Sequence, residues 1–194
     1  ALAAYEKVNA SNLASAASFF SAAKTKELLK ADAKEVIALM DSCVAHCPQP
    51  VTADFAPYLL ERAQLYMNND QARNAMLDYD AYYKAVNGQV NDLFYYYREQ
   101  AALKARQYQR ALDDIVKAIE LSPKDLTYRA EHAVINLRVG RYEESMQILN
   151  DILKDEPKYA EAYRLLGLCQ IQLKKTDEAC GNFNKAKELG DPNV

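Results

Sequence analysis

Hydrophobic residues recur along this chain at helical spacing, in segments separated by short polar or proline-containing stretches. One such segment places Leu13, Ala16, Ala17, Phe20 and Ala23 on a single helical face. Comparable segments follow each other to the end of the chain, and the connections between them are short. Since short turns force consecutive helices to lie side by side, the pattern predicts an all-α chain of antiparallel helical hairpins.

A second, longer period orders these segments. Ala111 is followed 34 residues later by Ser145, and Ser145 is followed after the same interval by Ala179. Pro123 and Pro157 stand the same distance apart. A fixed period of this length is typical of helical repeat proteins, in which each repeat packs on its neighbours rather than around one central core.

The two periods together predict a series of helical hairpins. Pro57 suits a first helical turn, whereas Asn87–Gly88 and Gly140 suit helix ends. Residues 1–8 have the spacing of the second helix of a repeat. The predicted pairs are 12–30 with 32–45, 57–68 with 71–86, 92–105 with 107–121, 125–139 with 141–154, and 158–173 with 176–189.

The last repeat carries the clearest family pattern, in Tyr163, Leu166, Gly167, Ala179, Phe183, Ala186 and Pro192. In this pattern and its period the chain resembles the tetratricopeptide repeat family. The resemblance implies a right-handed α–α superhelix of helix–turn–helix repeats, with first helices lining a concave face and second helices a convex face. It predicts a degenerate N-terminal region at 1–55 and repeats at 56–89, 92–125, 126–159 and 160–193, in one continuous solenoid.

Small residues are expected where the two helices of a repeat cross, with Gly167 and Ala133 facing Ala179 and Ser145. Glu99 breaks this rule, because it stands where the other repeats have alanine or glycine. A carboxylate at such a crossing must be paired or displaced. We expect an ion pair with an arginine such as Arg98 or Arg129, or a shift of the crossing to Ala101 and Ala102. The alternative is a polar site in the groove.

Composition narrows the range of partners. The net charge is −3 and the sequence pI is about 5.5, and no stripe of Lys or Arg offsets this balance, so nucleic acid is not an expected partner. No apolar run approaches the ~20 residues of a membrane span. The chain starts at Ala1 rather than Met, from which we expect that an upstream segment has been removed. Cytoplasm and bacterial periplasm are therefore not distinguished.

Residues for catalysis are sparse. The chain has no glycine-rich phosphate loop, nucleophile elbow or paired-carboxylate motif, so we expect no enzyme activity, catalytic residues or cofactor. Cys43, His46 and Cys47 form a remote candidate for a thiol or metal site, but the order does not match a known ligand motif, and no metal is expected. Cys169 and Cys180 fall on paired helices, where buried free thiols are the default and a disulfide the alternative.

The predicted first helices carry an apolar stripe edged by polar and basic residues. Such a surface suits an extended or helical peptide from a protein partner. The alternative is that neighbouring repeats cover it. The family's carboxylate-binding set of Lys, Asn and Arg is absent from these positions. The predicted groove residues are Gln64, Met67, Asn68, Tyr96, Gln100, Leu103, Lys104, Leu137, Arg138, Arg164, Leu168 and Ile171.

The sequence therefore predicts a non-catalytic protein-interaction scaffold. A second hypothesis is an assembly module of a larger chain, which associates with other copies through the uncapped ends of its solenoid.

Overall fold

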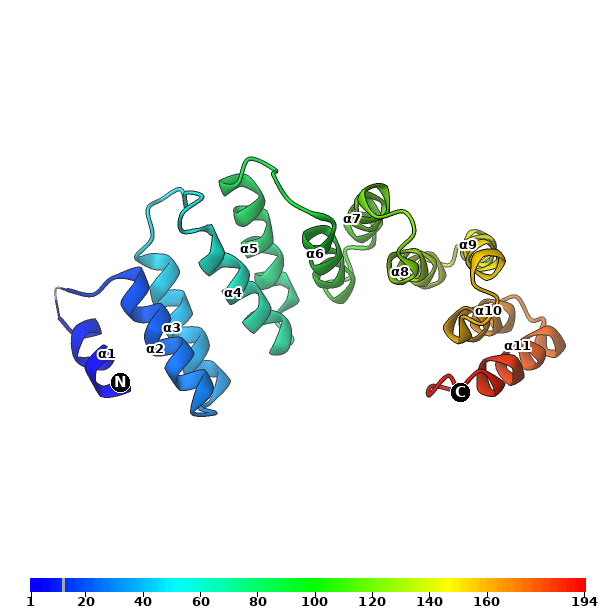
Figure 1. Ribbon diagram of the computed structural model, residues 1–194, viewed down its shortest axis with the longest axis horizontal. Coiled ribbons are helices and arrows are strands. Elements are labelled where there is room, and N and C mark those ends of the chain that lie inside the picture. The colour runs from blue at the N-terminus through cyan, green and yellow to red at the C-terminus, as the bar shows by residue number, and fades with distance from the viewer. Residues whose placement is uncertain (12) are drawn as a thin grey trace. The chain divides into compact units, whose positions relative to one another are not determined.

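The computed structural model describes residues 1–11 and 13–194, and every regular element in them is an α-helix (Figure 1). The chain divides into two compact units, residues 1–90 and 91–194, which are described separately below. The division falls within the connection at residues 89–91, where the repeat period is two residues longer than elsewhere. The predicted all-α fold of helical hairpins is confirmed, whereas the exact repeat boundaries stay a prediction.

The first unit contains a short leading helix and two hairpins. Helix α1 packs on α2, α2 pairs with α3, and α4 pairs with α5, while α3 packs on α4 between the hairpins. The helices are α1 (Leu2–Asn9), α2 (Ala16–Leu28), α3 (Ala33–Ala45), α4 (Ala56–Asn68) and α5 (Ala72–Ala85).

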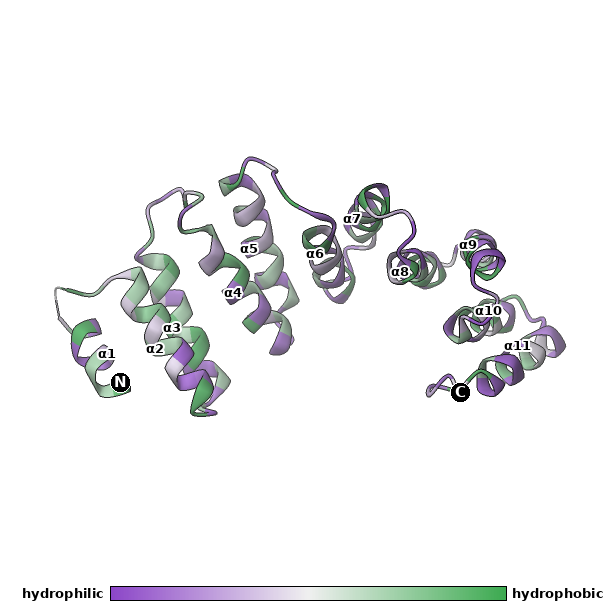
Figure 2. Cartoon of the chain, viewed as in Figure 1, coloured by the Kyte–Doolittle hydropathy of each residue, from purple (hydrophilic) through white to green (hydrophobic). Residues whose placement is uncertain are grey.

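The second unit contains three hairpins, and consecutive hairpins pack on each other. Helix α8 touches α10 directly as well as α9, so first helices of successive repeats lie against one another. The helices are α6 (Asp92–Lys104), α7 (Tyr108–Leu121), α8 (Leu126–Arg138), α9 (Tyr142–Asp155), α10 (Ala160–Gln172) and α11 (Thr176–Glu188). In both units hydrophobic and hydrophilic residues alternate around the helices, as amphipathic packing requires (Figure 2).

Several helices begin at a side-chain cap. The Ser15 hydroxyl accepts a hydrogen bond from the Ser18 amide, and α2 therefore starts at Ala16 rather than near residue 12 as predicted. The predicted start at Asn12 lies outside the described residues. Asn91 and Asp125 cap α6 and α8 in the same manner. These caps satisfy amide groups that the first helical turn leaves without a partner.

The turns inside the hairpins share one backbone conformation. Asp70, Arg106, Gly140 and Lys174 occupy the same repeat position, and all have a positive φ between 56° and 82°. The amide after each one bonds back to a carbonyl five residues earlier, as in Gln107 N to Ala102 O at 2.8 Å. This is the helix-ending arrangement that normally favours glycine. Only one of the four turns uses glycine, so residue type alone would not have located the others.

Close helix crossings lie where the small residues predict them. Ala133 and Ser145 are fully buried, and the Ser145 hydroxyl donates a hydrogen bond to the Ala133 carbonyl at 2.7 Å. In the last hairpin, a methyl group on Gly167 would stand 2.7 Å from the Phe183 ring. The Phe183 ring therefore packs on Gly167 within its own hairpin.

The core of the second unit joins two successive hairpins. Leu149 and Ile152 of α9 are fully buried against α8 and α10. Leu165 and Leu166 of α10 complete the cluster from the following hairpin. Since neither hairpin buries these residues alone, the hydrophobic effect holds the repeats together along the array.

The contact between Gly167 and Phe183 gives a test of the crossing. Gly167→Ala should lower stability by about 1–3 kcal/mol, because the added methyl group overpacks the contact. Gly181→Ala, in the facing helix, meets nothing within 4 Å and should raise stability by about 0.5–1 kcal/mol. Urea unfolding of both variants, followed by circular dichroism, measures the difference. Adding Phe183→Leu to Gly167→Ala should recover part of the loss. Equal stability of the two glycine variants would contradict the crossing.

Candidate partner-binding face

The predicted groove residues of the second unit all lie on α6, α8 and α10. We call the surface formed by these three first helices the first-helix face. Along it, Leu103 and Leu137 are partly exposed, while Leu168 and Ile171 leave 37% and 42% of their surface exposed. Leu137 also packs against the core between α8, α9 and α10. The apolar stripe is thus half covered by neighbouring repeats and half open.

Polar and aromatic residues border this stripe. The Tyr96 ring of α6 packs against the Tyr128 ring of α8, with centroids 5.3 Å apart. Arg164 of α10 pairs with Glu161 and with the nearly buried Asp191. Lys104 and Arg138 are exposed at the helix ends. These residues could contact a ligand from several sides, and their role in binding stays a prediction.

The remaining groove residues, Gln64, Met67 and Asn68, lie on α4 of the first unit. Gln64 and Asn68 are exposed, and the Gln64 amide donates to the Asn68 side chain at 3.0 Å. Met67 is partly buried. The three residues share one face of α4, as the periodicity predicts.

The predicted ion pair of Glu99 is wrong. Arg98 forms a bidentate pair with Asp114, and Arg129 pairs with Asp155. Within the described part of the chain, Glu99 accepts one hydrogen bond from Gln100 at 2.8 Å, and its Oε1 atom has no partner. The side chain is fully buried, and Ala101 and Ala102 are buried beside it.

The environment of Glu99 favours its neutral form. Burial raises the pKa of Glu99 to about 8, and the nearby charges of Glu131 and Asp114 act in the same direction. The hydrogen bond from Gln100 opposes the shift without cancelling it. At neutral pH the carboxyl group therefore holds its proton most of the time.

Glu131 of α8 forms a second carboxyl group beside Glu99. Burial raises the pKa of Glu131, and the charge of Glu161 adds to the shift, while a hydrogen bond with Gln100 and the charge of Arg138 oppose it. Gln100 thus hydrogen-bonds both carboxyl groups. The first-helix face carries two adjacent acids joined by one amide, which sequence reasoning anticipated only as a polar site.

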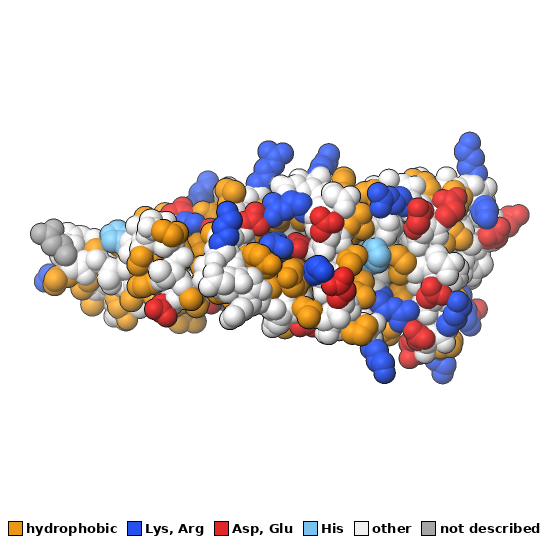
Figure 3. All heavy atoms as spheres, turned by 90° about the horizontal axis from the view of Figure 1, so that it is seen from above, with side chains coloured by type: hydrophobic (Ala, Val, Ile, Leu, Met, Phe, Trp, Pro, Cys, Tyr) orange, Lys and Arg blue, Asp and Glu red, His pale blue; other side chains and the backbone are white. Residues whose placement is uncertain are grey.

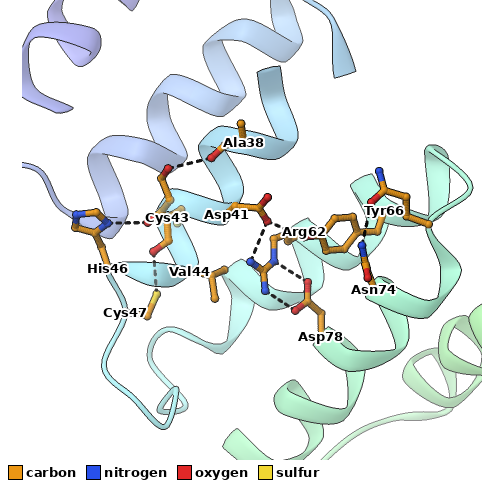
Figure 4. Close-up of polar contacts among 12 residues, drawn as sticks. Ala38, Asp41, Cys43, Val44, His46, Cys47, Arg62, Tyr66, Asn74 and Asp78 are labelled. Atoms are coloured by element: carbon orange, nitrogen blue, oxygen red, sulfur yellow. Dashed lines mark hydrogen bonds and ion pairs between the residues drawn. The ribbon is translucent and has the colours of Figure 1, made fainter. Parts of the chain in front are cut away.

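Buried arginine–aspartate pairs are a feature that the sequence reading missed. Arg62 binds Asp78 through two hydrogen bonds of 2.8 and 2.7 Å (Figure 4). Arg98 binds Asp114 through bonds of 2.8 and 2.6 Å. Both pairs join the two helices of a hairpin with the same separation of 16 residues. The recurrence of that spacing was the signal that could have revealed them. In the next hairpin His132 takes the arginine position.

The first pair extends to a neighbouring hairpin. Asp41 of α3 contacts Arg62 at 3.1 Å and accepts a hydrogen bond from the Tyr66 hydroxyl at 2.6 Å (Figure 4). Burial raises the pKa of Tyr66 to about 12, and the bond to Asp41 adds to the shift. The network of Asp41, Arg62, Tyr66 and Asp78 therefore links the degenerate first hairpin to the second one.

The remote candidate for a thiol or metal site, at Cys43, His46 and Cys47, consists of side chains that make structural contacts. Cys43 is fully buried, and burial raises its thiol pKa to about 12, so the reactive thiolate is scarce. The His46 ring contacts the Ser42 carbonyl at 2.7 Å and packs on Phe19. Across residues 1–11 and 13–194, no cluster of three or more His, Cys, Asp or Glu side chains could hold a metal ion.

The other two cysteines are both free thiols. The Cys169 thiol is fully buried and donates a hydrogen bond to the Ser145 hydroxyl at 3.4 Å. Cys180 is exposed, contrary to the expectation that all four thiols are mostly buried. The alternative of a disulfide between them is therefore not found.

The second-helix side of the second unit carries a separate hollow of about 430 Å³ between α7 and its neighbours. Leu112 and Val116 provide its apolar lining, and His132 lies against it with Arg141. Burial lowers the pKa of His132, so this histidine is neutral at physiological pH. The mixed lining favours no single class of ligand.

On the surface that is visible in Figure 3, Lys and Arg side chains are interspersed with Asp and Glu, and hydrophobic side chains lie between them. This arrangement offers no extended basic patch on that face for a nucleic-acid backbone. Each described helix is too short or too polar to serve as a membrane span.

The paired helices, the repeated turns and the stacked cores define a helical-repeat protein. Residues 102–169 match the family model described as "Tetratricopeptide repeat". These residues of the chain therefore carry tetratricopeptide repeats.

Curated relatives share part of this chain. Heat shock protein STI1 of Saccharomyces cerevisiae is 31% identical over 101 residues, which are 50% of this chain and 17% of that protein. DnaJ homolog subfamily C member 7 of Homo sapiens is 25% identical over 89 residues, which are 46% of this chain and 18% of that protein. The matched part thus corresponds to less than a fifth of the length of each.

Solved structures share the fold over nearly the whole chain. YrrB, described as a TPR protein with an unusual peptide-binding site, superposes with a TM-score of 0.69 at 17% identity, covering 99% of this chain and 95% of that one. MamA superposes with a TM-score of 0.70 at 19% identity, covering 88% and 95%. At these identities the likeness concerns the fold alone.

The buried Glu99 predicts a dependence of stability on pH. Between the ordinary carboxyl pKa of 4.5 and about 8, the folded state binds more protons than the unfolded state, so stability falls as pH rises. Urea midpoints at pH 6 and pH 9 should therefore differ in the wild type and differ less in Glu99→Gln. Glu144→Gln, at an exposed position on α9, is the control and should behave as the wild type. Parallel pH profiles for wild type and Glu99→Gln would contradict the buried protonated state.

Proposed function

We propose that this chain is a non-catalytic scaffold that binds a peptide segment of a protein partner along its first-helix face. The observation that carries the proposal is the half-open apolar stripe of Leu103, Leu137, Leu168 and Ile171, bordered by polar side chains. Single exposed hydrophobic residues are ordinary on protein surfaces. Leu103, Leu137 and Ile171 stand at one repeat position on successive helices, with Leu168 one turn earlier, and this arrangement suits a ligand that follows the repeats.

The relatives support an interaction function without identifying the partner. YrrB is described as having a peptide-binding site, and it shares the fold of this chain. The matches to STI1 and to DnaJ homolog subfamily C member 7 cover about half of this chain and less than a fifth of those proteins, so they support a shared module rather than a shared activity of the whole proteins. The first-helix face is therefore the surface to test.

Gln64, Met67 and Asn68 on α4 extend the proposal to the first unit. Their exposure and common helical face suit partner contact within that unit alone. Association through the solenoid ends is the alternative, and sedimentation over a range of concentrations separates it from groove binding, which requires no self-association.

The test replaces two stripe residues by charges. Leu103→Glu with Leu137→Glu should abolish capture of protein partners from a lysate of the source organism, because the carboxylates would be desolvated under an apolar ligand. Val116→Glu with Leu121→Glu adds the same charge on α7, where both residues are exposed, and should leave capture unchanged. Circular dichroism checks that each double variant is folded. If the first-helix variant still captures partners, the first-helix face is not the binding surface. If the α7 variant loses capture, binding involves the second helices.

A further inference from the structure

The first-helix face contains two acidic side chains that the fold does not neutralise. Among the residues that the structure describes, neither Glu99 nor Glu131 forms an ion pair, and both share the single amide of Gln100. Arg98 is paired with Asp114, and Arg164 with Glu161 and Asp191. Arg138 acts on Glu131 through its charge, which opposes the rise in the pKa of that carboxyl group. A cluster of acids alone is common on protein surfaces and identifies no ligand.

A second observation distinguishes this cluster. Glu99 is fully buried, yet its Oε1 atom has no hydrogen-bond partner, whereas buried polar atoms are almost always satisfied. The group stands among Glu131, Gln100 and Tyr96, since both glutamates influence the pKa of Tyr96 and Glu131 is the main neighbouring charge at Glu99. An unsatisfied carboxyl oxygen at this point leaves a place for a donor from outside the chain, which would bind the ionised form of Glu99.

The surroundings specify the chemistry of that donor. Two carboxyl groups call for a cation, and an elongated cation with several N–H donors would satisfy both at once. The Tyr96 and Tyr128 rings provide an aromatic wall on which a planar cation packs favourably. A guanidinium group meets both requirements better than an ammonium group does.

We infer that Glu99 and Glu131 form a recognition point for a cationic side chain, preferentially arginine, carried by the peptide that binds the first-helix face. The inference rests on the proposed function and adds the class of residue that the partner must present. Glu131, which is partly exposed, contacts the cation directly. Glu99 releases its proton on binding, and its Oε1 atom accepts a hydrogen bond from the same cation. The apolar stripe then binds the residues that flank the arginine.

The experiment selects a phage-displayed library of random linear peptides on the purified chain. Wild-type selections should yield peptides with Arg or Lys at one recurring position among apolar residues. A synthetic copy of the most enriched peptide should bind Glu131→Gln about tenfold more weakly, as expected for one charged hydrogen bond. Replacing the arginine of this peptide by glutamine should cause a similar loss of affinity for the wild type. The glutamine peptide should bind Glu131→Gln almost as well as it binds the wild type, because the two changes remove the same contact.

Charge reversal provides a readout that a merely structural role would not produce. Selections on Glu131→Lys should replace the recurring Arg or Lys by Asp or Glu at the same position. Glu144→Lys, an exposed reversal on α9, should leave the selected peptides unchanged. Circular dichroism confirms that both variants are folded.

Proton release gives a second readout. A bound cation stabilises the ionised form of Glu99, so the arginine peptide should bind more tightly at pH 9 than at pH 6.5. The charged groups facing Glu99 are Glu131 from α8 and Asp114 from α7, and Asp114 is paired with Arg98. In Glu99→Gln this dependence on pH should become weaker, because the buried proton is absent.

The outcomes separate the two proposals. The inference is overturned if the peptides require Leu103 and Leu137 but show no recurring cation. It is also overturned if they bind Glu131→Gln as well as the wild type. Either result leaves the proposed function intact. If peptides still bind when both leucines are replaced by glutamate, the apolar stripe is not the binding surface. If those peptides nevertheless depend on Glu131, the proposed recognition of a cation by the carboxyl groups is retained. Failure to enrich any peptide on the wild type overturns both.

Discussion

The close approach of two helices at small side chains is the constraint on which every hairpin of this protein depends. Ala133 against Ser145 and Gly167 against Phe183 show how little space remains at the crossing. Once the crossing is fixed, the outer faces of the paired helices have a defined spacing, and the next hairpin can bury its apolar residues against them. The stacked core of α8, α9 and α10 is the result.

This constraint also explains why a carboxyl group at the crossing has such an altered pKa. Glu99 occupies a position where the other repeats have a methyl group or a hydrogen atom, and burial there removes water from both oxygens. The fold tolerates it because the group is neutral and Gln100 satisfies one oxygen. A local departure from the repeat pattern thus coincides with a strongly altered electrostatic environment.

The elements were predictable from the sequence, because the helical and repeat periods both survive in it. The helix bounds agree to within a few residues, except at the start of α2, where the Ser15 cap determines the first turn. The partners of buried charges were not predictable in the same way. Arg98 lies next to Glu99 in sequence, yet it binds Asp114 on the paired helix, since side chains one residue apart point in different directions. The recurring separation of Arg62 from Asp78 and of Arg98 from Asp114 contained the necessary information, but its meaning depends on knowing how the helices cross.

The hairpin turns have a consequence for how such a chain can change. Asp70, Arg106, Gly140 and Lys174 adopt one left-handed backbone shape with side chains of opposite charge or with none, and the equivalent carbonyl is bonded each time. The small conformational penalty at each non-glycine residue is absorbed by the two helices it joins. The tips of the hairpins are consequently free to diversify in charge while the helices beneath them stay constant, and each loop can acquire new electrostatic character independently of the others.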